Sequence, residues 1–74
     1  MRQLHEIAKE IKQDWRKPYF GAVPYLDALS TMKSVDDGYG HDDGHTMVIY
    51  FLSNATGWRG DVARRIKLEL KSMI

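Results

Sequence analysis

The sequence predicts an all-α fold, a compact bundle of about four helices with one long loop rich in aspartate and glycine. Three observations lead to this prediction. Apolar residues recur every three or four positions near both ends of the chain, as they do along one face of a helix. Glycines and aspartates gather in one segment, residues 34–44. The chain has only 74 residues, 43% of them apolar, which suits a single domain over residues 1–74.

The first helix is predicted over residues 2–15. Its apolar positions share one stripe and comprise Leu4, Ile7, Ala8, Ile11 and Trp15. Lys17-Pro18 ends this helix, because the residue before a proline is forced out of the helical conformation. Pro24 suits a first helical turn, so a second, short helix is expected over residues 24–32.

The segment 45–54 contains the longest apolar run, from Met47 to Leu52. Periodicity cannot distinguish a buried strand from a buried helix in so short a run. A lone strand would leave its backbone hydrogen-bonding groups unpaired, and no other segment has strand character. We therefore expect a buried central helix, apolar around most of its circumference, with Asp42 or Asp43 as its N-cap and Ile49 in the core.

A last helix is predicted over residues 58–73, with Thr56 as its N-cap. Asp61 near its start and Lys71 near its end both complement the helix dipole. Its apolar stripe comprises Trp58, Val62, Ile66, Leu70 and Met73.

Composition excludes several classes of protein. The chain has no cysteine, so it has no disulfide framework, no thiolate zinc site and no thiol nucleophile. Its longest apolar run is far below the roughly 20 residues that a membrane span needs. The N-terminus alternates charges where a signal peptide would be apolar. We therefore expect a cytosolic protein without a membrane partner.

Charge is segregated along the chain although the net charge is only +1. Residues 34–46 hold four aspartates and no lysine or arginine, whereas the segments before and after this stretch are mildly basic. Electrostatic arguments must therefore concern local patches and not the whole chain.

The stretch 36–45 is the most unusual in the sequence. An EF-hand is excluded, because the carboxylates at alternate positions are missing and no glutamate lies between Glu10 and Glu69. A zinc or other transition-metal site is one hypothesis, because His41 and His45 are four residues apart and would share a helical face.

The third ligand of such a metal site would be Asp37, Asp42 or Asp43. A simpler interpretation is that the aspartates cap the following helix, in which case no cofactor is bound. We expect this simpler outcome, because two histidines without cysteine or a helical glutamate form an incomplete ligand set. A third interpretation is an acidic surface for a partner, formed by Asp36, Asp37, Tyr39, Asp42 and Asp43.

Two basic faces are candidates for binding phosphates. One follows the last helix and comprises Arg64, Lys67 and Lys71, and the other follows the first helix and comprises Arg2, His5, Lys9, Lys12 and Arg16. A charged face opposite an apolar stripe is also what any solvated helix shows. Both interpretations stay open at this point.

The aromatic residues divide into two groups. Trp15 and Trp58 lie on apolar stripes and are expected in the core. Tyr19, Phe20 and Tyr39 fall in predicted connections, where they are candidates for anchoring a partner. Leu68 is expected to be exposed among basic residues on the outer side of the last helix.

Catalytic motifs are missing from the sequence. It has no Ser-His-Asp pattern, no phosphate-binding glycine loop and no HExxH motif. We therefore expect a protein that is not an enzyme. A metal-dependent hydrolase that uses the loop histidines and aspartates is the one enzymatic alternative.

Three blocks span almost the whole chain: residues 8–11 with Trp15 and residues 19–26; residues 37–42; and residues 50–55 with residues 58–61 and 63–67. With these blocks the chain resembles a group of small, mostly uncharacterised proteins encoded by phages and prophages of low-GC Gram-positive bacteria. The resemblance carries no catalytic motif. It implies a host-cell setting, in which small phage proteins commonly bind a host macromolecule, and inhibitors of CRISPR effectors are one such class.

The leading hypothesis is therefore a non-enzymatic phage or mobile-element protein that binds a host protein and inhibits it. A nucleic-acid-binding accessory protein that works through the two basic faces is the alternative.

Overall fold

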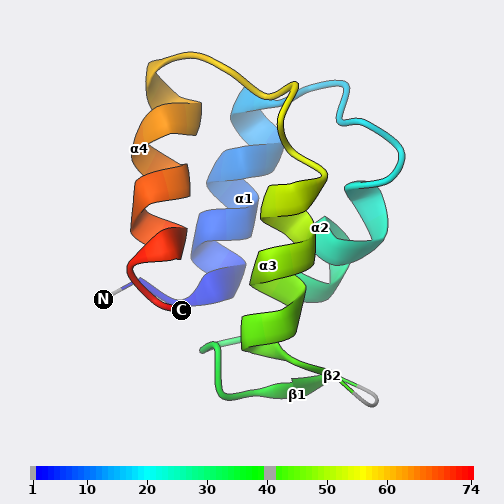
Figure 1. The fold of residues 1–74 in the computed structure, drawn as a ribbon, viewed down its shortest axis with the longest axis vertical. Coiled ribbons are helices and arrows are strands. Elements are labelled where there is room, and N and C mark those ends of the chain that lie inside the picture. Colours follow the sequence, from blue (N-terminus) through cyan, green and yellow to red (C-terminus); the bar gives the residue numbers. More distant parts are fainter. Residues whose placement is uncertain (1, 40–41) are drawn as a thin grey trace.

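The computed structural model describes residues 2–39 and 42–74. Four helices carry the fold: α1 (Leu4–Asp14), α2 (Val23–Leu29), α3 (Gly44–Ser53) and α4 (Asp61–Lys71). They form a small all-α bundle, as the sequence predicted, with α1 and α4 side by side and α2 beside α3 (Figure 1). Both chain ends lie at the same end of the bundle, and the connections 15–22 and 54–60 lie at the other (Figure 1).

The segment expected to be one irregular loop contains two short strands, β1 (Gly38–Tyr39) and β2 (Asp42–Asp43). They pair antiparallel, with Gly38 opposite Asp43 and Tyr39 opposite Asp42. The all-α fold is confirmed, and this short hairpin inside the predicted loop is a local feature that the sequence analysis did not foresee. The cause is local, because a two-residue strand needs only one hairpin partner and carries no periodic signal.

The apolar stripes of α1 and α4 form the core as predicted. Leu4, Ile7 and Ile11 of α1 are at most 1% exposed, and Ile66 and Leu70 of α4 are fully buried. The helices are shorter than predicted, and α4 begins at Asp61 with Gly60 as its N-cap, so the prediction of Thr56 as N-cap is wrong.

Helix α3 is only half surrounded, which corrects the expectation of a central helix. Val48 and Phe51 are fully buried, whereas Ile49 is 47% and Tyr50 43% exposed. Thr46, Ile49 and Ser53 lie three and four residues apart, so Ile49 belongs to the outer stripe of the helix. The placement of Ile49 in the core was therefore wrong.

The start of α1 is capped by backbone from a distant segment. Its first two N–H groups, of Leu4 and His5, donate to the carbonyl oxygens of Lys33 and Met32 at 2.9 and 2.8 Å. These groups have no partner within the helix itself, so the contact removes a cost of burying the helix end.

The opposite end of the bundle is organised around Trp58, which is 2% exposed. Its ring stacks on Trp15 with the centroids 5.8 Å apart and meets Phe51 edge-on at 6.3 Å. Its indole N–H donates to Asp14 Oδ2 at 2.8 Å. Trp58 therefore joins the end of α1, the core face of α3 and the connection that leads to α4.

Gly44 starts α3 against the backbone of Val35. The N–H of Gly44 donates to the carbonyl of Asp37, and that of His45 donates to the carbonyl of Val35. A Cβ at position 44 would lie 2.5 Å from Val35 Cα and 2.7 Å from Val35 O. Backbone atoms cannot move aside as the end of a flexible side chain can. Only glycine therefore fits at position 44 without a shift of the hairpin.

We therefore expect Gly44→Ala to lower the free energy of unfolding by about 1 to 3 kcal/mol, the usual cost of overpacking. Gly38→Ala is the matched control, because a Cβ at Gly38 meets nothing within 4 Å. Urea denaturation followed by circular dichroism measures both. Equal stabilities of the two variants would contradict the close approach of Gly44 to Val35.

Candidate functional site

Two of the loop aspartates have structural partners. Asp43 is the N-cap of α3, and its Oδ1 accepts hydrogen bonds from the N–H and the hydroxyl of Thr46, both at 3.0 Å. These hydrogen bonds lower the pKa of Asp43. Asp37 Oδ2 accepts the backbone N–H of Lys33 at 2.8 Å. The capping interpretation is therefore confirmed for Asp43.

The remaining loop residues are placed only in part. Asp36 is exposed, and Tyr39 and Asp42 are described as strand residues of the hairpin. His45 lies half-buried in the first turn of α3. The predicted ligand His41 lies outside the described residues.

Within residues 2–39 and 42–74 no three potential ligands gather around a point that could hold a metal ion. The proposed metal set of His41, His45 and Asp37 therefore stays a prediction.

The basic face of α4 is divided by structural contacts. Arg64 pairs with Asp61 at 2.8 Å. Lys67 Nζ donates to the carbonyl of Trp58 at 2.6 Å and lies 5.9 Å from the centroid of the Trp58 ring. Burial lowers the pKa of Lys67, and repulsion from Lys71 and Arg59 lowers it further. Of the three predicted residues, Lys71 alone is exposed and has no side-chain hydrogen bond or ion pair found in the described part of the chain.

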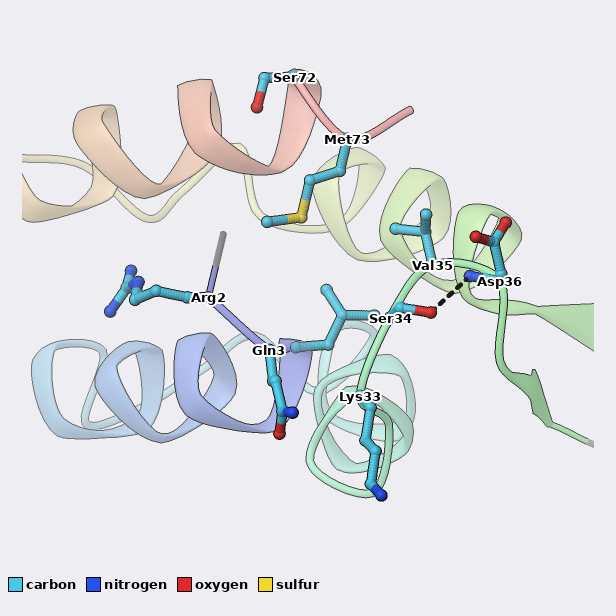
Figure 2. A pocket seen from close by; sticks show the side chains of 9 residues that line it. Arg2, Gln3, Lys33, Ser34, Val35, Asp36, Ser72 and Met73 are labelled. Carbon is cyan, nitrogen blue, oxygen red and sulfur yellow. Dashed lines mark hydrogen bonds between the residues drawn. The ribbon is translucent and has the colours of Figure 1, made fainter.

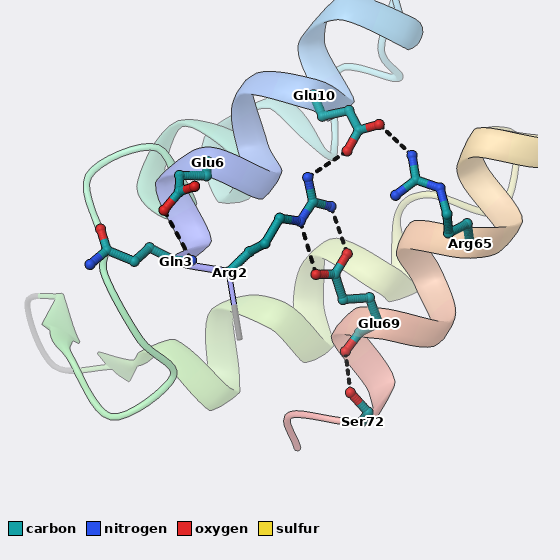
Figure 3. Close-up of polar contacts among 7 residues, drawn as sticks. All are labelled: Arg2, Gln3, Glu6, Glu10, Arg65, Glu69 and Ser72. Carbon is teal, nitrogen blue, oxygen red and sulfur yellow. Dashed lines mark hydrogen bonds and ion pairs between the residues drawn. The ribbon is translucent and has the colours of Figure 1, made fainter.

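Arg2 belongs to a set of ion pairs between α1 and α4 and not to a phosphate-binding face. We call this set, formed by Arg2, Glu10, Arg65 and Glu69, the buttress. The Arg2 guanidinium donates to Glu69 with both Nε and Nη2, at 3.0 and 2.6 Å, and to Glu10 at 2.6 Å (Figure 3). Arg65 pairs with the other oxygen of Glu10. These contacts hold the pKa values of Glu10 and Glu69 below their usual range, chiefly through the hydrogen bonds from the arginines.

The rest of the α1 basic face is exposed and only lightly paired. Lys12 lies 3.4 Å from Asp27, and a ring nitrogen of His5 makes a hydrogen bond with Gln3. None of the ion pairs found in the described part of the chain involves Lys9 or Arg16. His5, Lys9 and Lys12 line one hollow, so this part of the predicted α1 face forms a single surface.

A group of cations and aromatics gathers where α1 ends. The Trp15 and Trp58 stack sets the two following residues, Arg16 and Arg59, at the same end of the bundle. Lys17, Tyr19 and Phe20 continue the connection from there. We call Arg16, Lys17, Tyr19 and Phe20, which all lie in the connection 15–22, the basic-aromatic corner. The sequence analysis named Tyr19 and Phe20 as candidates but did not join them to Arg16 and Lys17.

A second exposed apolar surface lies on α2 and α3 and comprises Tyr25, Ile49 and Tyr50. We call it the α3 face. The rings of Tyr25 and Tyr50 pack with their centroids 5.3 Å apart. Sequence reasoning missed this surface, although the polar residues Thr46 and Ser53 flanking Ile49 at helical spacing carried the signal.

A hollow of about 380 Å³ opens between the chain ends and the segment that precedes β1 (Figure 2). Its walls include Leu4, Val35 and Met73, which are apolar. The side chains of Arg2 and Lys33 extend away from Met73, and the Arg2 guanidinium is already bound to Glu10 and Glu69 (Figure 2). Neither of these two cations is therefore placed to fix a small ligand in the hollow.

The buttress makes the free energy of unfolding fall at acid pH. Because the folded-state pKa values of Glu10 and Glu69 are depressed, their contribution is present above the unfolded-state value of about 4.3 and is lost as pH falls below it. We expect Glu69→Gln to lower the melting temperature at neutral pH and to reduce the further loss on going from about pH 5 to about pH 3.

Asp36→Asn is the control for this experiment, because it removes one exposed carboxylate for which no ion pair is found in the described part of the chain. Thermal unfolding at both pH values measures the effect. A Glu69→Gln profile that coincides with that of Asp36→Asn would contradict a stabilising role of the buttress.

No helix in the described residues is long and apolar enough to cross a membrane. Comparison with known proteins gives no relative: no family model matches the chain, and neither a curated protein nor a solved structure matches it.

Proposed function

We propose that this chain is a non-enzymatic binding protein that docks a protein partner on the α3 face. The observation that carries the proposal is the exposure of Ile49 and Tyr50, at 47% and 43%, next to each other on a helix of the bundle. Tyrosine is among the residues that contribute most to binding when an interface desolvates it, and the aliphatic side chain of Ile49 adds exposed apolar area beside Tyr50.

The α3 face is held rigidly from beneath. Val48 and Phe51, on the opposite side of the same helix, are fully buried. Tyr25 packs its ring against Tyr50 and restricts the side chain on which a partner would close. Because little freedom is left to lose, binding at this face carries a small ordering cost.

The setting of the proposal comes from the resemblance to small phage and prophage proteins. It supports a host protein as the partner, and inhibition of a host system such as a CRISPR effector as the consequence. The absence of catalytic motifs from the sequence favours binding over catalysis.

The test is capture of proteins from a lysate of a low-GC Gram-positive bacterium, with and without nuclease, by the wild-type chain and two variants. Ile49→Asp places a charge on the α3 face, and Leu68→Asp places the same charge at an isolated leucine of α4 that is 65% exposed. We expect both variants to fold, because neither side chain belongs to the core.

A nuclease-resistant partner should be retained by Leu68→Asp and lost by Ile49→Asp. Loss of a central anchor of an interface typically weakens binding by about 30-fold or more. Calorimetry with the purified partner measures this factor. Equal binding by the two variants, or recovery of nucleic acid alone, would contradict docking at the α3 face.

A further inference from the structure

The basic-aromatic corner is distinct from the α3 face and combines three features. The first is exposed aromatic surface in a connection: Phe20 is 79% and Tyr19 51% exposed, with their ring centroids 4.8 Å apart. Phe20 is more exposed than any other large hydrophobic side chain found in the described residues. A phenylalanine in this position contributes nothing to the core of the free protein.

The second feature is positive charge without internal compensation. The ion pairs found in the described residues engage Arg2, Lys12, Arg64 and Arg65, and none of them engages Arg16, Lys17 or Arg59. All three of these cations are exposed. Arg16 and Lys17 precede Tyr19 in the same connection, whereas Arg59 lies in the connection that leads to α4.

The third feature is a hollow of about 440 Å³ beside the Tyr19 ring, lined also by Ser53, Asn54, Thr56 and Gly57. The hydroxyl of Ser53 donates to Ile49 O, and the amide of Asn54 donates to Tyr50 O. The polar side chains around the hollow are therefore neutral, and the charges lie outside it.

We propose that the basic-aromatic corner binds a short single-stranded segment of nucleic acid. A base stacks on Phe20, neighbouring phosphates pair with Arg16 and Lys17 of the same connection, and a neighbouring base edge enters the hollow beside Tyr19. Aromatic platforms flanked by cations are the usual means of binding single strands, because each base has a face that stacks.

The chemistry of the corner favours a single strand over the other anionic partners. A duplex hides its base faces, so it would leave Phe20 unused. An acidic peptide would satisfy the cations, but its carboxylates do not stack on the exposed ring as a base does. The proposal does not depend on the α3 face, because the two surfaces share no residue.

The test uses fluorescein-labelled eight-nucleotide oligothymidine and oligouridine, with anisotropy measured at about 50 to 200 mM salt. We expect Phe20→Ala to weaken binding by about 5- to 150-fold, the range for loss of one stacked base. Phe20→Tyr should retain binding, because its ring is also flat. Leu68→Ala is the control for truncating an exposed apolar side chain elsewhere.

The charges are tested by the slope of binding against salt concentration. Replacing Arg16 and Lys17 by glutamine together should reduce the slope by about 1.4, at roughly 0.7 for each phosphate contact with a single strand. Lys71→Gln removes an exposed charge at the other end of α4 and should leave the slope nearly unchanged. Circular dichroism confirms that each variant is folded.

Three results would overturn the proposal: no binding of either oligonucleotide at 50 mM salt, binding that Phe20→Ala leaves unchanged, or equal competition by a DNA duplex. Competition by polyglutamate as strong as by the oligonucleotide would also overturn it and would indicate an acidic protein surface. Ile49→Asp should bind the oligonucleotide as the wild-type chain does. This result would separate the present proposal from the proposal that a protein docks on the α3 face.

Discussion

The packing of Trp58 is the contact on which one end of the bundle depends, the end that carries the connections 15–22 and 54–60. Its ring lies against both Trp15 and Phe51, its N–H reaches Asp14, and its carbonyl accepts Lys67. One side chain thereby joins three helices and two connections. A carboxylate at the C-terminal end of a helix opposes the helix dipole, so the hydrogen bond from Trp58 also offsets an unfavourable position of Asp14 at the end of α1.

The distribution of ion pairs separates structural charges from available ones. Arg2 and Arg65 are engaged by Glu10 and Glu69 across the interface of α1 and α4. Of the cations for which no ion pair is found in the described residues, Arg16, Lys17 and Arg59 lie in the two connections at the Trp58 end of the bundle, and Lys9, Lys33, Lys67 and Lys71 lie elsewhere. The acidic hairpin lies at the other end of the bundle (Figure 1). Such a separation of charge orients an anionic ligand before contact, so the same packing that stabilises the fold also polarises its surface.

The local features of the fold could be predicted from the sequence, and the non-local ones could not. The α1 stripe and the Asp43 cap follow from spacing and residue type within a few positions. Ile49 was misplaced because a continuous apolar run has no periodicity from which its outer side can be identified. The stack of Trp15 on Trp58 was not foreseen, because it joins two residues that are far apart in the sequence. Likewise, nothing near Arg2 in the sequence indicates that it reaches Glu69.

The most direct measurement of this organisation is a double-mutant cycle on the free energy of unfolding, with Asp14→Ala, Trp58→Phe and the two combined. A hydrogen bond to a charged group predicts a coupling energy of about 1 kcal/mol or more between the two sites. Because the carboxylate opposes the helix dipole, Asp14→Ala should be neutral or stabilising once the indole N–H is gone. Effects that add to within about 0.3 kcal/mol would contradict the central role of the Trp58 contact.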